Sequence, residues 1–92
     1  MYEVMEYTDV RPSIDNPNPT PLERSIGVFE VEQDAVEAGR AVRAEFIESE
    51  RAEYTWWTVR QPGSRLANWI ADSHSPKEFM LDLTSGELVE ME

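Results

Sequence analysis

Only one stretch of this chain, residues 33–51, repeats its apolar residues with the spacing of a helix. Val36, Gly39, Val42 and Phe46 follow one another at intervals of three and four and form one stripe. Gly39 costs up to ~1 kcal/mol in helix propensity, and a close contact with a sheet would explain it. A single helix cannot cover both faces of a large sheet. The rest of the chain must therefore curl over the second face or leave that face partly bare.

Most of the remaining chain favours strands. Residues rich in β-formers and bounded by turn signals predict strands over 2–10, 25–31, 54–61 and 79–84. Gly27, in the second of these, marks a candidate bulge or a close backbone approach. Residues 11–24 carry four prolines among Ser, Asp and Asn, and we expect a long loop there, because proline removes a backbone donor and holds the chain extended.

Residues 66–72 fit two structures. Leu66, Trp69 and Ile70 share one face of a helix that Ser64 would cap. The same segment lies between two turn signals and has strands on both sides, so we favour a strand.

The chain end predicts a hairpin. Thr84-Ser85-Gly86 fits a type I turn closed by a glycine in the left-handed region. That turn pairs Leu83 with Glu87 and Leu81 with Val89, and it places Phe79, Leu81, Val89 and Met91 on one face. The predicted fold is one α+β domain over residues 1–92 in ββαββββ order. It is an antiparallel sheet of five to six strands with one helix packed on one face.

Composition excludes several classes of protein. The chain has 92 residues and no cysteine, so it contains no disulfide, thiolate metal site or cysteine nucleophile. Met1–Glu6 has neither the basic nor the apolar region of a secretory signal, and the apolar runs are far shorter than the ~20 residues of a membrane helix. We expect a cytoplasmic protein that does not bind membranes.

The charge is spread unevenly. Eight basic residues stand against nineteen acids, a formal charge of −11. Residues 54–77 hold three basic residues and one acid, net +2, which leaves −13 on the rest of the chain. The same segment contains all three tryptophans. Because nucleic acids and anionic lipids are polyanions, this charge predicts basic protein partners and no direct nucleic-acid binding.

Few residues indicate catalysis. His74 is the only histidine and lies in Ser73-His74-Ser75-Pro76, a turn composition. A serine triad built from neighbours in one turn, with Asp72 as the acid, would not reach the required geometry. No second histidine or cysteine supports a metal, and Asp15-Asn16-Pro17-Asn18 lacks the acid and glycine of a calcium loop. We therefore expect no enzyme, metal or cofactor; a small carboxylate-based enzyme is the least favoured alternative.

The tryptophan-rich segment indicates binding. Trp56 and Trp57 are consecutive on a predicted strand and point to opposite faces, so both are buried only if both faces are covered. The alternative is that one of them lies on an exposed face near Arg60 and Arg65, because Trp and Arg are typical of interface hot spots. The predicted docking residues are Trp56, Trp57, Arg60, Arg65 and Trp69. A self-complementary patch of this kind would give a homodimer.

The acids suggest a second mode of binding. Same-face strand residues lie ~6.6–6.8 Å apart, a scale comparable to the phosphate spacing of DNA. The predicted acidic surface comprises Glu30, Glu32, Glu45, Glu48, Glu87, Glu90 and Glu92. In composition the chain resembles the DNA-mimic inhibitors encoded by phages and mobile elements. The favoured hypothesis is a non-enzymatic protein-binding adaptor, regulator or inhibitor, and the alternative is a DNA mimic that occupies the basic groove of a nucleic-acid-binding protein.

Overall fold

The computed structural model describes residues 1–91, so the predictions made for Glu92 lie outside the described residues. Six strands and one helix follow the predicted ββαββββ order. Their bounds are β1 Tyr2–Thr8, β2 Leu22–Phe29, α1 Glu32–Glu48, β3 Thr55–Arg60, β4 Trp69–Asp72, β5 Glu78–Asp82 and β6 Glu87–Glu90. The predicted α+β class is confirmed.

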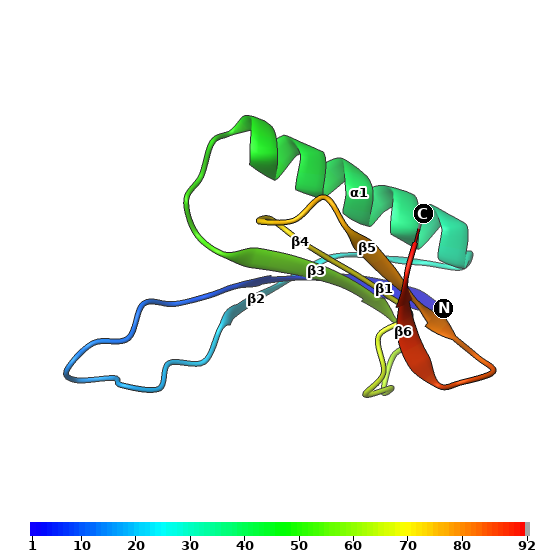
Figure 1. Ribbon diagram of the computed structural model, residues 1–92, viewed down its shortest axis with the longest axis horizontal. Helices are drawn as coiled ribbons and strands as arrows, with labels where there is room; N and C mark the ends of the chain where they lie inside the picture. The colour runs from blue at the N-terminus through cyan, green and yellow to red at the C-terminus, as the bar shows by residue number, and fades with distance from the viewer. Residues whose placement is uncertain (92) are drawn as a thin grey trace.

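All neighbouring strands are antiparallel and form one sheet in the order β2-β1-β3-β4-β5-β6. From β2, at the edge, the chain passes through α1 to β3, so the helix crosses over β1, which lies between these two strands. The helix packs on β1, β2 and β3. Figure 1 shows it along one face of the curved sheet, with no helix or strand across the other face. The sheet does not curl over that face. Of the two alternatives stated for the second face of the sheet, the structure adopts the one in which this face is left partly bare.

The predicted stripe is the buried side of α1. Val36, Gly39 and Phe46 are buried and Val42 is half-buried. A Cβ atom on Gly39 would lie 2.7 Å from the ring of Trp69, closer than packed carbon atoms approach. The glycine is therefore explained by the sheet beneath it: the helix backbone rests almost directly on an indole ring.

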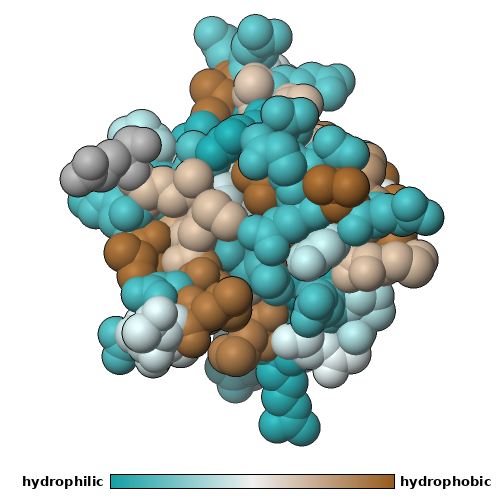
Figure 2. Space-filling model, turned by 90° about the vertical axis from the view of Figure 1, so that its right-hand side faces the viewer, coloured by the Kyte–Doolittle hydropathy of each residue, from teal (hydrophilic) through white to brown (hydrophobic). Residues whose placement is uncertain are grey.

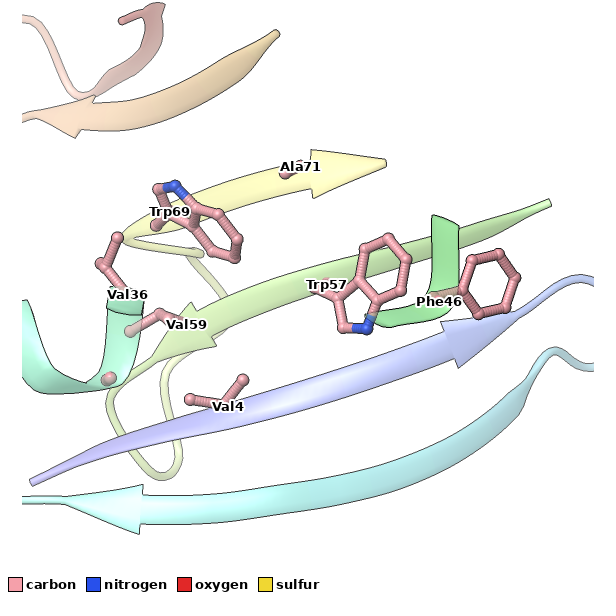
Figure 3. Close-up of a cluster of buried hydrophobic side chains, with 8 residues drawn as sticks. Val4, Val36, Phe46, Trp57, Val59, Trp69 and Ala71 are labelled. Carbon is pink, nitrogen blue, oxygen red and sulfur yellow. The ribbon is translucent and has the colours of Figure 1, made fainter. Parts of the chain in front are cut away.

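Two tryptophans form the centre of the core. Trp57 and Trp69 have no exposed surface, and Figure 3 shows them on β3 and β4 among Val4, Val59 and Phe46. The Phe46 ring meets the Trp57 ring edge to face, with centroids 5.4 Å apart. Such contacts add about 0.5–1.5 kcal/mol to the burial of the rings.

Each buried indole N–H donates to a glutamate that is itself paired with an arginine. Trp57 Nε1 donates to Glu6 Oε2 at 2.9 Å, and an Arg24 nitrogen lies 3.1 Å from the same oxygen. Trp69 Nε1 donates to Glu78 Oε1 at 2.9 Å. Burial without these acceptors would cost each indole its hydrogen bond to water.

Helix arginines turn toward the sheet. Arg40 Nε pairs with Glu78 Oε1 at 2.6 Å, and Arg43 Nε donates to the carbonyl of Asp72 at 2.8 Å. Arg43 also donates to the carbonyl of Ser75 in the β4–β5 loop. Both basic side chains of α1 are thus directed at β4 and β5, and the charged residues on the outer side of the helix are acids.

The first hairpin differs from its prediction at its ends. The second strand begins at Leu22 instead of Ser25, so the loop spans residues 9–21 and not 11–24. The register shifts between Val4 and Met5, where Ile26 is the extra residue beside Gly27. The bulge suggested by Gly27 is confirmed.

The ambiguous segment is a strand, but a short one. Within 66–72, only Trp69–Asp72 pairs in the sheet. Leu66 is exposed in the preceding loop, and Asn68 N donates to the carbonyl of Val59 at 2.6 Å, where the loop joins the sheet.

The predicted register of the last hairpin is wrong by one residue. Leu81 pairs with Leu88 and Phe79 pairs with Glu90. The loop has four residues, 83–86: Gly86 N donates to the carbonyl of Asp82 at 2.7 Å, and Gly86 has a φ of 74°. A slip of one residue moves every side chain of one strand to the other face. Phe79 and Leu81 therefore lie on the side away from α1, opposite Val89.

Candidate functional site

The uncovered side of the sheet carries a set of aromatic and aliphatic side chains. They alternate with core residues along their strands and are matched across them: Tyr7 with Trp56, and Ile70 with Phe79. These four side chains are half-buried, although no helix or strand of residues 1–91 lies over them. We call the surface formed by Tyr7, Trp56, Ile70 and Phe79 the open face.

Trp56 is fixed in place by two tyrosines. The Tyr7 ring stacks on it with centroids 5.5 Å apart and planes at 16°. The Tyr54 ring also contacts Trp56: the ring centroids are 5.6 Å apart and the ring planes are inclined at 40°. Tyr54 is in turn stacked on His74 at 5.0 Å and 19°. The rings of Tyr7, Trp56, Tyr54 and His74 therefore form one continuous set of contacts.

Two polar residues lie among these rings. Arg60 is placed over the Tyr7 ring, 5.8 Å from its centroid. Thr58 is 3% exposed, and its Oγ1 atom and the Nε atom of Arg60 are buried without a hydrogen bond within residues 1–91. Such groups are costly in isolation and mark a surface whose polar pairing is incomplete.

Asp72 forms the polar edge of the open face. It pairs across the sheet with Trp56. Its Oδ2 atom accepts a hydrogen bond from the Tyr54 hydroxyl at 3.2 Å, and Oδ1 accepts the backbone N–H of His74 at 2.9 Å. Burial, and then the negative charge of Asp72, raise the pKa of Tyr54 above its ordinary value.

The five predicted docking residues do not form one surface. Trp56 and Arg60 lie on the open face, and Arg65 is exposed in the β3–β4 loop. Trp57 and Trp69 have no exposed surface, because both lie under α1. They have no atoms to offer a partner, and their part in the predicted docking set is corrected to a part in the core.

Sequence reasoning missed three members of the open face. Tyr7 follows the period-two alternation of β1, which would have placed it beside Trp56 once the β1–β3 pairing was known. Ile70 has the same alternation within β4. Phe79 was predicted to share a face with Val89 and Met91. Because the register of the last hairpin differs by one residue, Phe79 lies on the opposite face of the sheet from Val89.

The predicted acidic surface is divided among three regions. Glu30 and Glu32 lie at the start of α1, Glu45 and Glu48 lie near its end, and Glu87 and Glu90 belong to β6. Glu90 is paired with Lys77, whose Nζ atom lies 3.9 Å from its carboxylate. Figure 2 looks onto the end of the molecule that carries β6 and shows hydrophobic patches divided by hydrophilic residues.

The only histidine lies beside serines that serve the backbone. The Ser73 hydroxyl accepts the N–H of Thr55 at 3.0 Å, and the Ser75 hydroxyl accepts that of Lys77 at 3.2 Å. No group of three or more His, Asp or Glu side chains within residues 1–91 is arranged to hold a metal ion. In the same part of the chain, no helix is long and apolar enough to cross a membrane.

Two hollows differ in their chemistry. The larger, of about 470 Å³, lies between α1 and β2 and contains acids and arginines, including the paired Glu6 and Arg24. The smaller, of about 270 Å³, lies on the open face, with Asp72 as the only charged residue of its lining. Comparison of the chain with protein-family models, curated proteins and solved structures gave no match. The arrangement therefore has to be interpreted from its own chemistry: a fixed aromatic surface with a carboxylate at its edge suits noncovalent binding.

Proposed function

We propose that this protein is a small non-enzymatic binding domain that docks a basic partner protein on the open face. The observation that carries the proposal is Trp56, a half-buried indole held between Tyr7 and Tyr54 on a side of the sheet that no helix or strand of residues 1–91 covers. Buried aromatic anchors supply most of the free energy in protein interfaces.

Charge selects the class of partner. The chain has a net charge of −11. Of the charged side chains beside the open face, Arg60 lies over Tyr7 and Glu90 is paired with Lys77, whereas Asp72 has no ion-pair partner within residues 1–91. A second copy would bring another −11 against this surface, whereas a basic protein would be attracted and steered toward it. The proposal therefore favours a basic partner over a homodimer.

A DNA mimic remains the second candidate. Its support is the outer side of α1, where Asp34, Glu37, Glu45 and Glu48 are exposed while the helix arginines point to the sheet. The two candidates use different surfaces, the open face for an adaptor and the helix for a mimic, so substitutions separate them.

Variants of the two surfaces provide the test. Proteins retained from the source cell by the parent chain are compared with those retained by Trp56→Ala and by the double variant Glu45→Lys/Glu48→Lys. Each candidate partner is then purified, and its affinity is measured by calorimetry at low and high salt. Unchanged far-ultraviolet circular dichroism serves as the control for folding.

The expected result is a purified basic partner whose affinity falls at least tenfold with Trp56→Ala and much less with the helix variant. The reverse pattern, with steep loss of affinity in salt, would establish the mimic instead. A partner indifferent to Trp56→Ala would overturn the proposed open-face function.

A further inference from the structure

The open face is hollowed at one end by the pocket of about 270 Å³. Its lining comprises three aromatic residues, two apolar residues and one acid: Tyr54, Trp56, Phe79, Ile70, Ala71 and Asp72. Rings around a single acid are the composition of sites that bind organic cations, because the ring faces and the carboxylate both attract positive charge.

The aromatic wall of this pocket is built from rings in mutual contact. Tyr54 and Trp56 meet at a centroid distance of 5.6 Å with their planes inclined at 40°. The Tyr7 ring stacks on Trp56, and the His74 ring stacks on Tyr54. The Tyr54 hydroxyl is tied to Asp72 at 3.2 Å. A ligand thus meets rings already in position and does not have to order them.

Asp72 has capacity for a ligand. A carboxylate offers about four lone-pair sites. Two are used, by the Tyr54 hydroxyl and the His74 backbone N–H. Among residues 1–91, no arginine or lysine forms an ion pair with it. The nearby Lys77 is directed to Glu90. The pKa of the Tyr54 hydroxyl is raised first by burial and then by the negative charge of Asp72.

We propose that this pocket receives an arginine side chain of the partner, with the alkyl stem on Ile70 and Phe79 and the guanidinium group between the Trp56 ring and Asp72. The inference rests on the proposed function, since the arginine belongs to the basic partner. Arginine fits better than lysine because its guanidinium is planar, weakly hydrated and able to stack on a ring while donating two hydrogen bonds to a carboxylate.

Small probes test the pocket without any knowledge of the partner. The ¹⁵N-labelled chain is titrated with Nα-acetylarginine amide, the lysine analogue and the citrulline analogue, which is a neutral isostere. The readout is the indole N–H signal of Trp56. Trp57 and Trp69 are internal references, since their indole N–H groups are hydrogen-bonded to Glu6 and Glu78 in the core.

A matched pair of variants completes the design. Asp72→Asn removes the charge but keeps a side-chain oxygen for the His74 N–H. The control is Asp82→Asn, because Asp82 accepts the N–H of Thr84 at 2.8 Å in the same i to i+2 arrangement but lies outside the pocket. Both variants change the net charge equally, so a general electrostatic effect would appear in both.

The arginine probe is expected to shift the Trp56 signal and leave the two core signals in place. Citrulline should bind at least tenfold more weakly, lysine should be intermediate, and Asp72→Asn should weaken arginine binding at least tenfold while Asp82→Asn does not. Equal binding of arginine and citrulline, equal effects of the two variants, tighter binding of lysine than of arginine, or a Trp56 signal that no probe moves would overturn the inference.

The inference and the proposed function fail in distinguishable ways. If a purified partner depends on Trp56 but not on Asp72, the docking face stands and the arginine pocket is wrong. If the arginine probe binds as expected but no protein partner depends on Trp56, the pocket stands as a cation site and the proposed function is wrong.

Discussion

Two neighbouring residues of β3, Trp56 and Trp57, have opposite surroundings. Trp57 lies under α1, with Phe46 against its ring and Glu6 on its N–H. Trp56 points to the open face, where the rings of Tyr7 and Tyr54 lie against it. The difference teaches that residue type did not decide burial here. Burial was decided by the alternation of the strand and by the presence of one helix on one face, so the covered face contains the core and the open face stays without helix cover.

The largest expected effect compares a phenylalanine on each face. Phe46→Ala should lower the free energy of unfolding by about 3–5 kcal/mol, because Phe46 is buried against Trp57. Phe79→Ala, on the half-buried open face, should cost clearly less. Denaturant titration of both variants measures this, and equal losses would mean that the open face is as much a core as the covered one.

A glycine gives the next largest effect. Gly39→Ala would place a methyl group 2.7 Å from the buried ring of Trp69, so overpacking should cost about 1–3 kcal/mol despite the better helix propensity of alanine. Ala44→Gly, on the exposed side of α1, is the control and should cost about 1 kcal/mol for propensity alone. Stabilisation by Gly39→Ala in a thermal melt would contradict the close approach of helix and sheet.

A smaller effect on stability is expected at Trp56. Trp56→Phe keeps an aromatic ring beside Tyr7, so its cost should not exceed the about 0.5–1.5 kcal/mol of an aromatic pair. The same variant should remove most of the fluorescence that iodide quenches, because Trp57 and Trp69 have no exposed surface. Quenching that persists in the variant would show that a core tryptophan is reached by solvent.

The smallest effect is a change with pH at the edge of the open face. The folded chain holds the Tyr54 proton more tightly than the unfolded chain, because burial and then Asp72 raise the pKa of this hydroxyl. The free energy of unfolding should therefore fall as pH rises past the ordinary tyrosine pKa. Tyr54→Phe should remove that part of the alkaline loss, and Asp72→Asn should bring the pKa seen by absorbance titration back toward its ordinary value.

Local patterns predicted most of the fold. The stripe on residues 33–51 identified both the helix and its buried side. The opposed directions of Trp56 and Trp57 left two alternatives, both buried or one on an uncovered face, and the structure has Trp57 buried and Trp56 on the uncovered face. These features depend on the period of a single segment. The α+β class with one helix follows from the number of segments that have the helical or the strand period.

The predictions that were wrong or missing concern contacts between residues far apart in the sequence, or a turn whose length differs by one residue. The last hairpin slipped because Asp82 and Gly86 close a four-residue loop, which alternation alone does not specify. The burial of Trp69 depends on its contact with Gly39, which lies thirty positions earlier in the sequence. The hydrogen bond from Trp57 to Glu6, and its support by Arg24, joins three strands. Contacts of this kind between distant residues leave no mark on the period of a single segment.

The inward direction of Arg40 and Arg43 has a consequence for the behaviour of the chain in electrolytes. With these cations committed to Glu78 and to backbone carbonyls, the last turn of α1 carries acids and no basic residue, next to the negative end of the helix dipole. Folding gathers this uncompensated charge into a small volume, so the native state should accumulate more sodium or potassium ions than the unfolded chain. Added salt would thus strengthen the fold while weakening attraction to a basic partner, and the two properties would respond to ionic strength in opposite directions.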